Sequence, residues 1–117
     1  MTRLLLIDDA PSFRMSLVAL LEDEGFEVDE ADSHETALAR LDHARYDGVL
    51  LDVNLCKQNG LELVLPIRER CPGAAIVVLS GSPIGAADAS EVDAALLKTE
   101  SFADVLATLR RVLHGAG

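Results

Sequence analysis

Three carboxylates, one hydroxyl and one amine each stand at the end of a short apolar run in this sequence. They belong to Asp8, Asp9, Asp52, Ser80 and Lys98. Carboxylates that share a crevice raise one another's pKa unless a cation compensates, so a common site for the acids calls for a metal ion. Oxygen ligands with room left for water and phosphate favour Mg²⁺ over zinc or copper. Because a hydroxyl and a mobile ammonium can hold phosphoryl oxygens, the set suggests phosphoryl transfer.

The apolar runs before these residues are typical of buried parallel strands. They cover residues 4–7, 48–51, 75–79 and 94–97, and a more exposed, alternating strand is expected at 26–31. Runs without alternation suit strands covered by helices on both faces. Open α/β sheets bind ligands in the crevice outside the carboxyl ends of such strands. We therefore expect the side chain of Asp52 to lie in that crevice, with the other four residues around it.

Helical patterns separate the predicted strands. Residues that favour the start of a helix stand at Pro11, Ser33, Gly60 and Ser101. Pro66 is expected to interrupt the middle of the third helix and to kink it or bend its register. Residues 81–93 leave space for a fourth helix of about one to two turns only, near Ala86 to Val92. The alternation predicts a single doubly wound α/β domain over residues 1–117.

Composition excludes several classes of function. The formal charge of −10 over 117 residues argues against direct binding to nucleic acid or to anionic lipid, which require Lys and Arg. No apolar stretch approaches the roughly 20 residues of a membrane span. Cys56 and Cys71 lack metal-binding spacing and are interpreted as reduced thiols. We therefore expect a cytoplasmic protein.

Four short motifs in this order resemble the receiver domains of two-component response regulators. They are IDD at 7–9, LLDVNL followed by NGLEL around Asp52, VVLSG at 77–81 and LLK at 96–98. The resemblance spans the whole chain. It implies a flavodoxin-like, five-stranded parallel sheet in the order 2-1-3-4-5. It also implies that Asp52 accepts a phosphoryl group, in a Mg²⁺-dependent reaction, from a sensor histidine kinase or a phosphotransfer protein.

Individual roles follow from this resemblance by position. Asp9 and Asp52 would ligate Mg²⁺ directly, Asp8 would act mainly through water, and Asn54 would contribute its backbone carbonyl. Ser80 and Lys98 would hold phosphoryl oxygens. The catalytic effect of such a site is positioning and charge neutralisation around a carboxylate nucleophile, with no turnover of substrate.

The sequence departs from the family pattern around the site. The proline that commonly stands four residues after the phosphorylated Asp is Cys56 here, so a less rigid loop is expected. The aromatic residue three positions before the lysine is Ala95, and the proline after the lysine is Thr99. We therefore expect a trans Lys98–Thr99 peptide. Without the aromatic switch, phosphorylation should be signalled by ordering of the loop 80–85.

Two other functions remain open at this point. The altered signalling residues would also suit a pseudo-receiver, an interaction scaffold that is never phosphorylated. A Mg²⁺-dependent phosphatase with an Asp nucleophile generally has the pattern DxD after the first strand, where this chain has Asp8, Asp9 and Ala10. The kinase, a downstream effector protein or domain, and the oligomeric state are not specified by the sequence. The chain could act alone or form one part of a longer protein.

Overall fold

Five parallel strands form the central sheet of the computed structural model, which describes residues 2–55 and 57–115. In sheet order they are β2 (Glu27–Ala31), β1 (Arg3–Ile7), β3 (Gly48–Asp52), β6 (Ala75–Ser80) and β7 (Ala94–Leu97). β6 and β7 are the fourth and fifth strands of this sheet along the chain. The predicted order 2-1-3-4-5 and the flavodoxin-like α/β fold are therefore confirmed.

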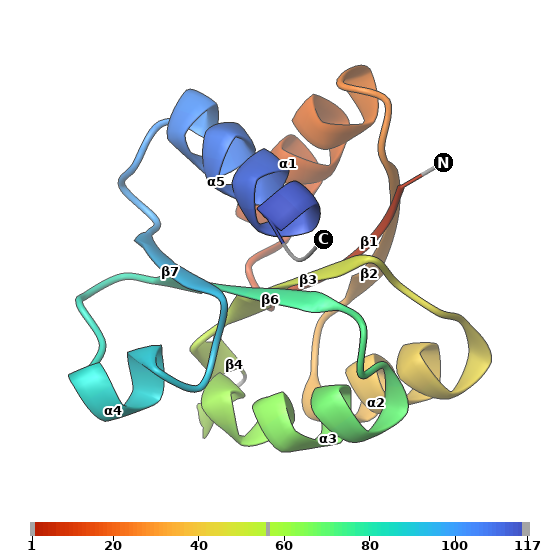
Figure 1. Ribbon diagram of the computed structural model, residues 1–117, viewed down its shortest axis with the longest axis vertical. Coiled ribbons are helices and arrows are strands. Elements are labelled where there is room, and N and C mark those ends of the chain that lie inside the picture. Colours follow the sequence, from red (N-terminus) through yellow and green to blue (C-terminus); the bar gives the residue numbers. More distant parts are fainter. Residues whose placement is uncertain (1, 56, 116–117) are drawn as a thin grey trace.

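Helices cover both faces of the sheet (Figure 1). One face carries α1 (Pro11–Asp23) and α5 (Phe102–Gly115), and the other carries α2 (His34–His43), α3 (Val64–Arg70) and α4 (Ala86–Ala89). Successive residues of a strand point to opposite faces, so Leu50 packs with the α1 and α5 side and Leu51 with the α2 and α3 side. Both leucines are fully buried, and each such burial stabilises the fold by about 1.5–3 kcal/mol.

Three of the four predicted helix starts, at Pro11, Ser33 and Ser101, are present in the structure. Pro11 is the first residue of α1, where its missing N–H leaves no helical hydrogen bond unmade. The hydroxyl of Ser33 accepts a hydrogen bond from the Thr36 N–H at 3.1 Å, and the Thr36 hydroxyl accepts one from the Ser33 N–H at 3.0 Å. This reciprocal arrangement is a capping box. The hydroxyl of Ser101 accepts from the Asp104 N–H at 3.2 Å before α5.

The segment between β3 and α3 differs from the prediction. Asn54–Leu55 (β4) and Gln58–Asn59 (β5) pair as a small antiparallel hairpin, and a 3₁₀ turn, η1 (Gly60–Leu63), precedes α3. Because α3 begins at Val64, Pro66 falls in its first turn, where N–H groups have no helical partner. Pro66 therefore does not interrupt the middle of the α-helix, and the change of register, from 3₁₀ to α, lies at Val64. The expectation for Cys56 lies outside the described residues.

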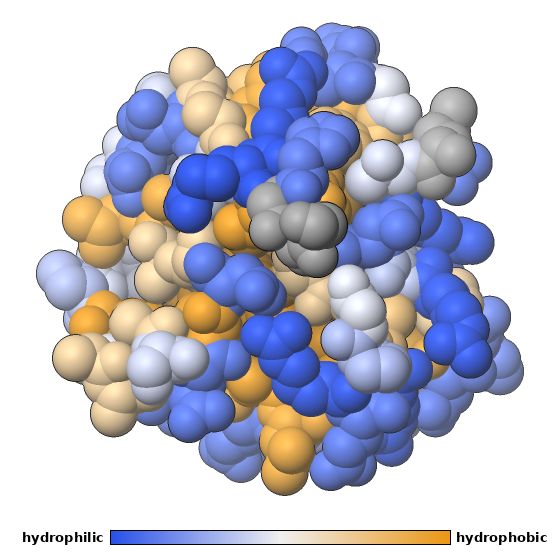
Figure 2. All heavy atoms as spheres, viewed as in Figure 1, coloured by the Kyte–Doolittle hydropathy of each residue, from blue (hydrophilic) through white to orange (hydrophobic). Residues whose placement is uncertain are grey.

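The end of the sheet near β7 is thinly covered. α4 is a single turn with no buried residue, as the short spacing predicted, and Ala95 of β7 is exposed. Figure 2 shows hydrophobic side chains more often around β7 and α4 than over α2. The Lys98–Thr99 peptide is trans, since the described residues contain no cis peptide bond. Within residues 2–55 and 57–115, no helix is long and apolar enough to cross a membrane.

Gly60 lies against the backbone that carries Asp52. Its N–H donates to the carbonyl oxygen of Val53, and the residue is buried. A Cβ atom built on Gly60 would overlap the carbonyl oxygen of Asp52. Only glycine lets the chain return this closely to the end of β3, so the residue fixes the path of the hairpin over the site.

We expect Gly60→Ala to lower the free energy of unfolding by about 1–3 kcal/mol, since the methyl group must displace a backbone segment. Chemical denaturation measures the change. Gly73→Ala is the matched control, because a Cβ at Gly73 meets no atom within 4 Å. Equal stability of the two variants would show that the approach of Gly60 to Asp52 is not a constraint.

Candidate functional site

Three carboxylates converge at the carboxyl end of the sheet. Asp8 and Asp9 follow β1, and Asp52 ends the neighbouring strand β3. One carboxylate oxygen from each of the three residues lies within 4.8 Å of the others. Asp8 has no exposed surface and Asp52 is 2% exposed, so water cannot screen their mutual repulsion well.

Lys98 supplies the nearest positive charge. It follows β7 directly, and its Nζ atom lies 2.9 Å from Oδ2 of Asp8 and 3.1 Å from Oδ2 of Asp52. The backbone N–H of Lys98 donates to the carbonyl oxygen of Ser80 at 2.7 Å, which holds the residue at the end of β6. One ammonium thus bridges two of the three acids.

The environment raises the pKa of both Asp52 and Lys98. For Asp52, burial is the largest cause, and the nearby charge of Asp8 adds to it, while the Asn54 N–H and Lys98 lower the pKa. For Lys98, burial lowers the pKa, but the Asp8 and Asp52 carboxylates outweigh this and raise it above its usual value. Lys98 is therefore fully charged at neutral pH.

Backbone amides hold the other oxygens of the two buried acids. The N–H of Ala10 donates to Oδ1 of Asp8 at 2.7 Å, and the N–H of Asn54 donates to Oδ1 of Asp52 at 3.1 Å. In both residues Oδ2 faces Lys98. Each carboxylate is thus oriented by its own loop, with one oxygen turned toward the shared centre.

Ser80 lies at the same edge of the sheet, but its hydroxyl is engaged elsewhere. The side chain is buried at the end of β6, and its Oγ donates to the Ser82 carbonyl oxygen at 2.5 Å and accepts from the Ser82 N–H at 3.2 Å. A cleft of about 420 Å³ opens beside Asn54 and Ser80, between the hairpin β4–β5 and the loop after β6. The hydroxyl would have to turn from Ser82 to reach a group bound there.

Two residues near the acids were not anticipated from the sequence. The ring centroid of Phe13 lies 4.7 Å from Nζ of Lys98, a cation–π contact. Arg14 donates from Nη1 to the carbonyl oxygen of Asp8 at 2.8 Å. Both residues are in the first turn of α1. Their types are ordinary in an amphipathic helix, so the sequence carries no signal for these contacts.

The donor set fits a hard divalent cation. Three carboxylates converge beside the Lys98 ammonium, which pairs with Asp8 and Asp52, so the group as a whole is negatively charged, and the metal-binding atoms it offers are oxygens. Thiol and imidazole ligands, which would favour zinc or copper, are absent from this cluster in the described part of the chain. Asp8, Asp9 and Asp52 are the residues that could bind Mg²⁺.

Known proteins resemble this chain in sequence. A family model for the response regulator receiver domain matches residues 4–110. A response regulator receiver protein of Anaeromyxobacter sp. (strain Fw109-5) is 38% identical over 80 residues, which cover 68% of this chain and 34% of that relative. The matched part is thus about a third of that relative's length.

Solved structures of response regulators share the fold closely. One from Burkholderia pseudomallei, with a phosphorylated aspartic acid, a calcium ion and citrate, has a TM-score of 0.87 at 27% identity, over 99% of this chain and 71% of that one. TrrA of Thermotoga maritima with Mg²⁺ and BeF has a TM-score of 0.87 at 29% identity, over 96% and 99%. TrrA in complex with the histidine kinase ThkA has a TM-score of 0.86 at 30% identity, over 97% and 99%.

These matches agree with the motifs and with the sheet order. Receiver domains are signalling domains of two-component systems and are not typical turnover enzymes. The strand-end acids, the parallel sheet and the family match over residues 4–110 together lead to one conclusion: this chain belongs to the response regulator receiver domain family.

Proposed function

We propose that this chain accepts one phosphoryl group on Asp52 from a histidine kinase or a phosphotransfer protein, in a Mg²⁺-dependent reaction. The observation that carries the proposal is the position of Asp52, buried beside two further acids and 3.1 Å from Lys98. A carboxylate oxygen of Asp52 forms the new bond to phosphorus as the bond to the donor's nitrogen breaks. The donor's imidazole leaves with the electron pair.

The other residues of the site position and neutralise charge. Asp8 and Asp9, with Asp52 and the backbone carbonyl of Asn54, would hold Mg²⁺. When bound, the metal neutralises the charge of the phosphoryl oxygens. Lys98 must exchange a carboxylate partner for a phosphoryl oxygen. It can do so because a flexible ammonium makes point contacts and requires no fixed fork geometry.

The partners and the setting of the chain belong to the same proposal. TrrA is found with the histidine kinase ThkA, which supports a sensor kinase as the phosphoryl donor here. We place the chain in the cytoplasm as one receiver domain over residues 1–117, acting on an effector protein or domain. The exposed Ala95 and the engaged hydroxyl of Ser80 favour the pseudo-receiver as the second candidate, and phosphorylation separates the two.

We propose that the signal leaves the site through Ser80. Its hydroxyl now bonds to the backbone of Ser82, so a bound phosphoryl group that attracts it would change the loop directly. Residues 81–83 and 85–88 are exposed and α4 has no buried residue, so this segment can rearrange at low energetic cost.

Acetyl phosphate with Mg²⁺ should add one phosphoryl group to Asp52, because its carboxylate is the acid that ends a buried strand beside Lys98. Intact mass spectrometry measures the adduct. Asp52→Asn should show none, whereas the exposed control Asp23→Asn should react like the wild type. A wild-type mass that stays unchanged with acetyl phosphate and with a phosphorylated kinase would favour the pseudo-receiver.

Asp9→Asn should weaken Mg²⁺ binding by at least about tenfold, since loss even of a residue behind the metal ligands typically costs that much. The same change should raise the stability of the metal-free protein, because one of three crowded charges is removed. Calorimetric titration and thermal unfolding without metal measure the two effects. Unaltered Mg²⁺ affinity would show that Asp9 takes no part in the site.

Beryllofluoride with Mg²⁺ should slow amide hydrogen exchange in residues 80–90 and change little in α5, because the response is expected to be ordering of the loop. Ser80→Ala should still bind Mg²⁺ and beryllofluoride but lose the slowing. A response concentrated in α5, or a loop unaffected when beryllofluoride is bound, would contradict this route.

A further inference from the structure

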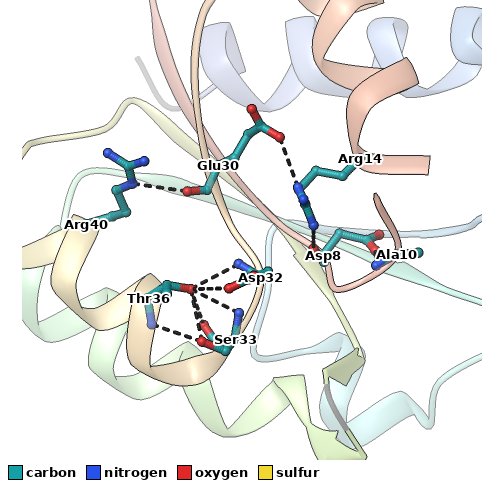
Figure 3. A network of polar contacts seen from close by, with 8 residues as sticks. All are labelled: Asp8, Ala10, Arg14, Glu30, Asp32, Ser33, Thr36 and Arg40. Carbon is teal, nitrogen blue, oxygen red and sulfur yellow. Dashed lines mark hydrogen bonds and ion pairs between the residues drawn. The ribbon is translucent and has the colours of Figure 1, made fainter. Parts of the chain in front are cut away.

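Arg14 connects the loop that carries Asp8 and Asp9 to the strand β2 (Figure 3). Its Nη1 atom donates to the carbonyl oxygen of Asp8 at 2.8 Å, and its Nε atom donates to Oε1 of Glu30 in β2 at 2.9 Å. The Arg14 side chain is 17% exposed and that of Glu30 41%. A largely buried guanidinium thus points toward the backbone of the acid loop.

The peptide that Arg14 contacts lies between two of the three acids. Successive side chains of a regular strand point to opposite faces, so Asp8 and Asp9 can reach one site only if the backbone leaves the strand between them. The strand β1 ends at Ile7, and Asp9 lies in a bend. The orientation of the Asp8–Asp9 peptide therefore decides whether both carboxylates reach the same centre.

The acid loop is held at two points. Arg14 binds the carbonyl oxygen of the Asp8–Asp9 peptide, and the next peptide holds the Asp8 side chain, because the N–H of Ala10 donates to Oδ1 of Asp8 at 2.7 Å. Glu30 orients the guanidinium. The backbone of Glu30 is itself held, because Nε of Arg40 in α2 donates to its carbonyl oxygen at 3.1 Å.

We propose that Arg14, oriented by Glu30, is a positioning residue that fixes the Asp8–Asp9 peptide so that both carboxylates face the Mg²⁺ site. The inference rests on the proposed Mg²⁺ binding. The charge of Arg14 and its positioning contact have opposite effects on Mg²⁺ affinity. A cation near the acids repels Mg²⁺, so removal of the charge alone would strengthen Mg²⁺ binding. Loss of the positioning contact would weaken Mg²⁺ binding.

Two variants separate these effects. Arg14→Gln removes the charge, and Arg14→Lys keeps the charge but replaces the rigid guanidinium fork by a single point donor. Positioning predicts that the dissociation constant for Mg²⁺ rises about tenfold or more for Arg14→Gln, and by less for Arg14→Lys. In phosphorylation by acetyl phosphate, the Mg²⁺ concentration that gives half the maximal rate should be higher for Arg14→Gln than for the wild type. At saturating Mg²⁺ the rate should stay near that of the wild type.

Arg3→Gln is the matched control. Arg3, the first residue of β1, forms a similar ion pair at 3.0 Å with Asp29 in the middle of β2, away from the end of β1 that carries the acids. This variant should retain the wild-type Mg²⁺ affinity, although it too loses one positive charge and one ion pair. A general loss of stability would affect both variants alike.

Hydrogen exchange of the Ala10 amide in the metal-free protein gives a second readout. It should be faster in Arg14→Gln than in the wild type and unchanged in Arg3→Gln. Tighter Mg²⁺ binding by Arg14→Gln, or wild-type affinity together with wild-type Ala10 exchange, would overturn the inference. If the wild type binds no Mg²⁺, the proposed function fails, and the Ala10 exchange alone then decides whether Arg14 fixes the loop.

Discussion

The structure depends on one electrostatic constraint, which is that three carboxylates, two of them buried, share one edge of the sheet with the Lys98 ammonium. Lys98 bridges Asp8 and Asp52 at 2.9 and 3.1 Å, and both acids are almost fully shielded from water. An unpaired charge in such a place would be strongly destabilising. The ion pairs of Lys98 with Asp8 and Asp52 thus offset the cost of burying the two carboxylates. The remaining negative charge would favour a bound divalent cation.

The sheet explains why the three acids meet. β1 and β3 are adjacent and parallel, so Asp8, Asp9 and Asp52 lie together at the carboxyl ends of these strands. Lys98 follows β7, and its side chain extends past the end of β6 to reach Asp8 and Asp52. Close backbone packing then sets the final positions. Gly60 returns against the Asp52 carbonyl, and Arg14 binds the Asp8 carbonyl. A close backbone approach at Gly60 and a side-chain contact from Arg14 thus lie directly against the backbone of two of the acids.

The part of the domain around α4 and β7 is packed less closely than the acid site. α4 is one turn without buried residues, and Ala95 offers no aromatic ring to move. The bonds from Ser80 to the Ser82 backbone connect the site to this weakly packed loop. A segment with so few buried contacts can change its order at low energetic cost, whereas the helices of the opposite face are anchored by the core.

The sequence by itself determined the fold class, the strand order and the group of acids with Lys98, because apolar runs ending in polar residues report strand ends directly, and the family motifs supplied the order. It also predicted the short α4, from the short segment 81–93 between two strands and from Gly81, Pro83 and Gly85 within it. The start of α3 at Val64, the hairpin β4–β5, the hydroxyl direction of Ser80 and the contacts of Phe13 and Arg14 were decided only by the tertiary structure. Each depends on which backbone or side-chain atom of a separate turn, strand or helix lies within reach, and local residue patterns do not encode those distances.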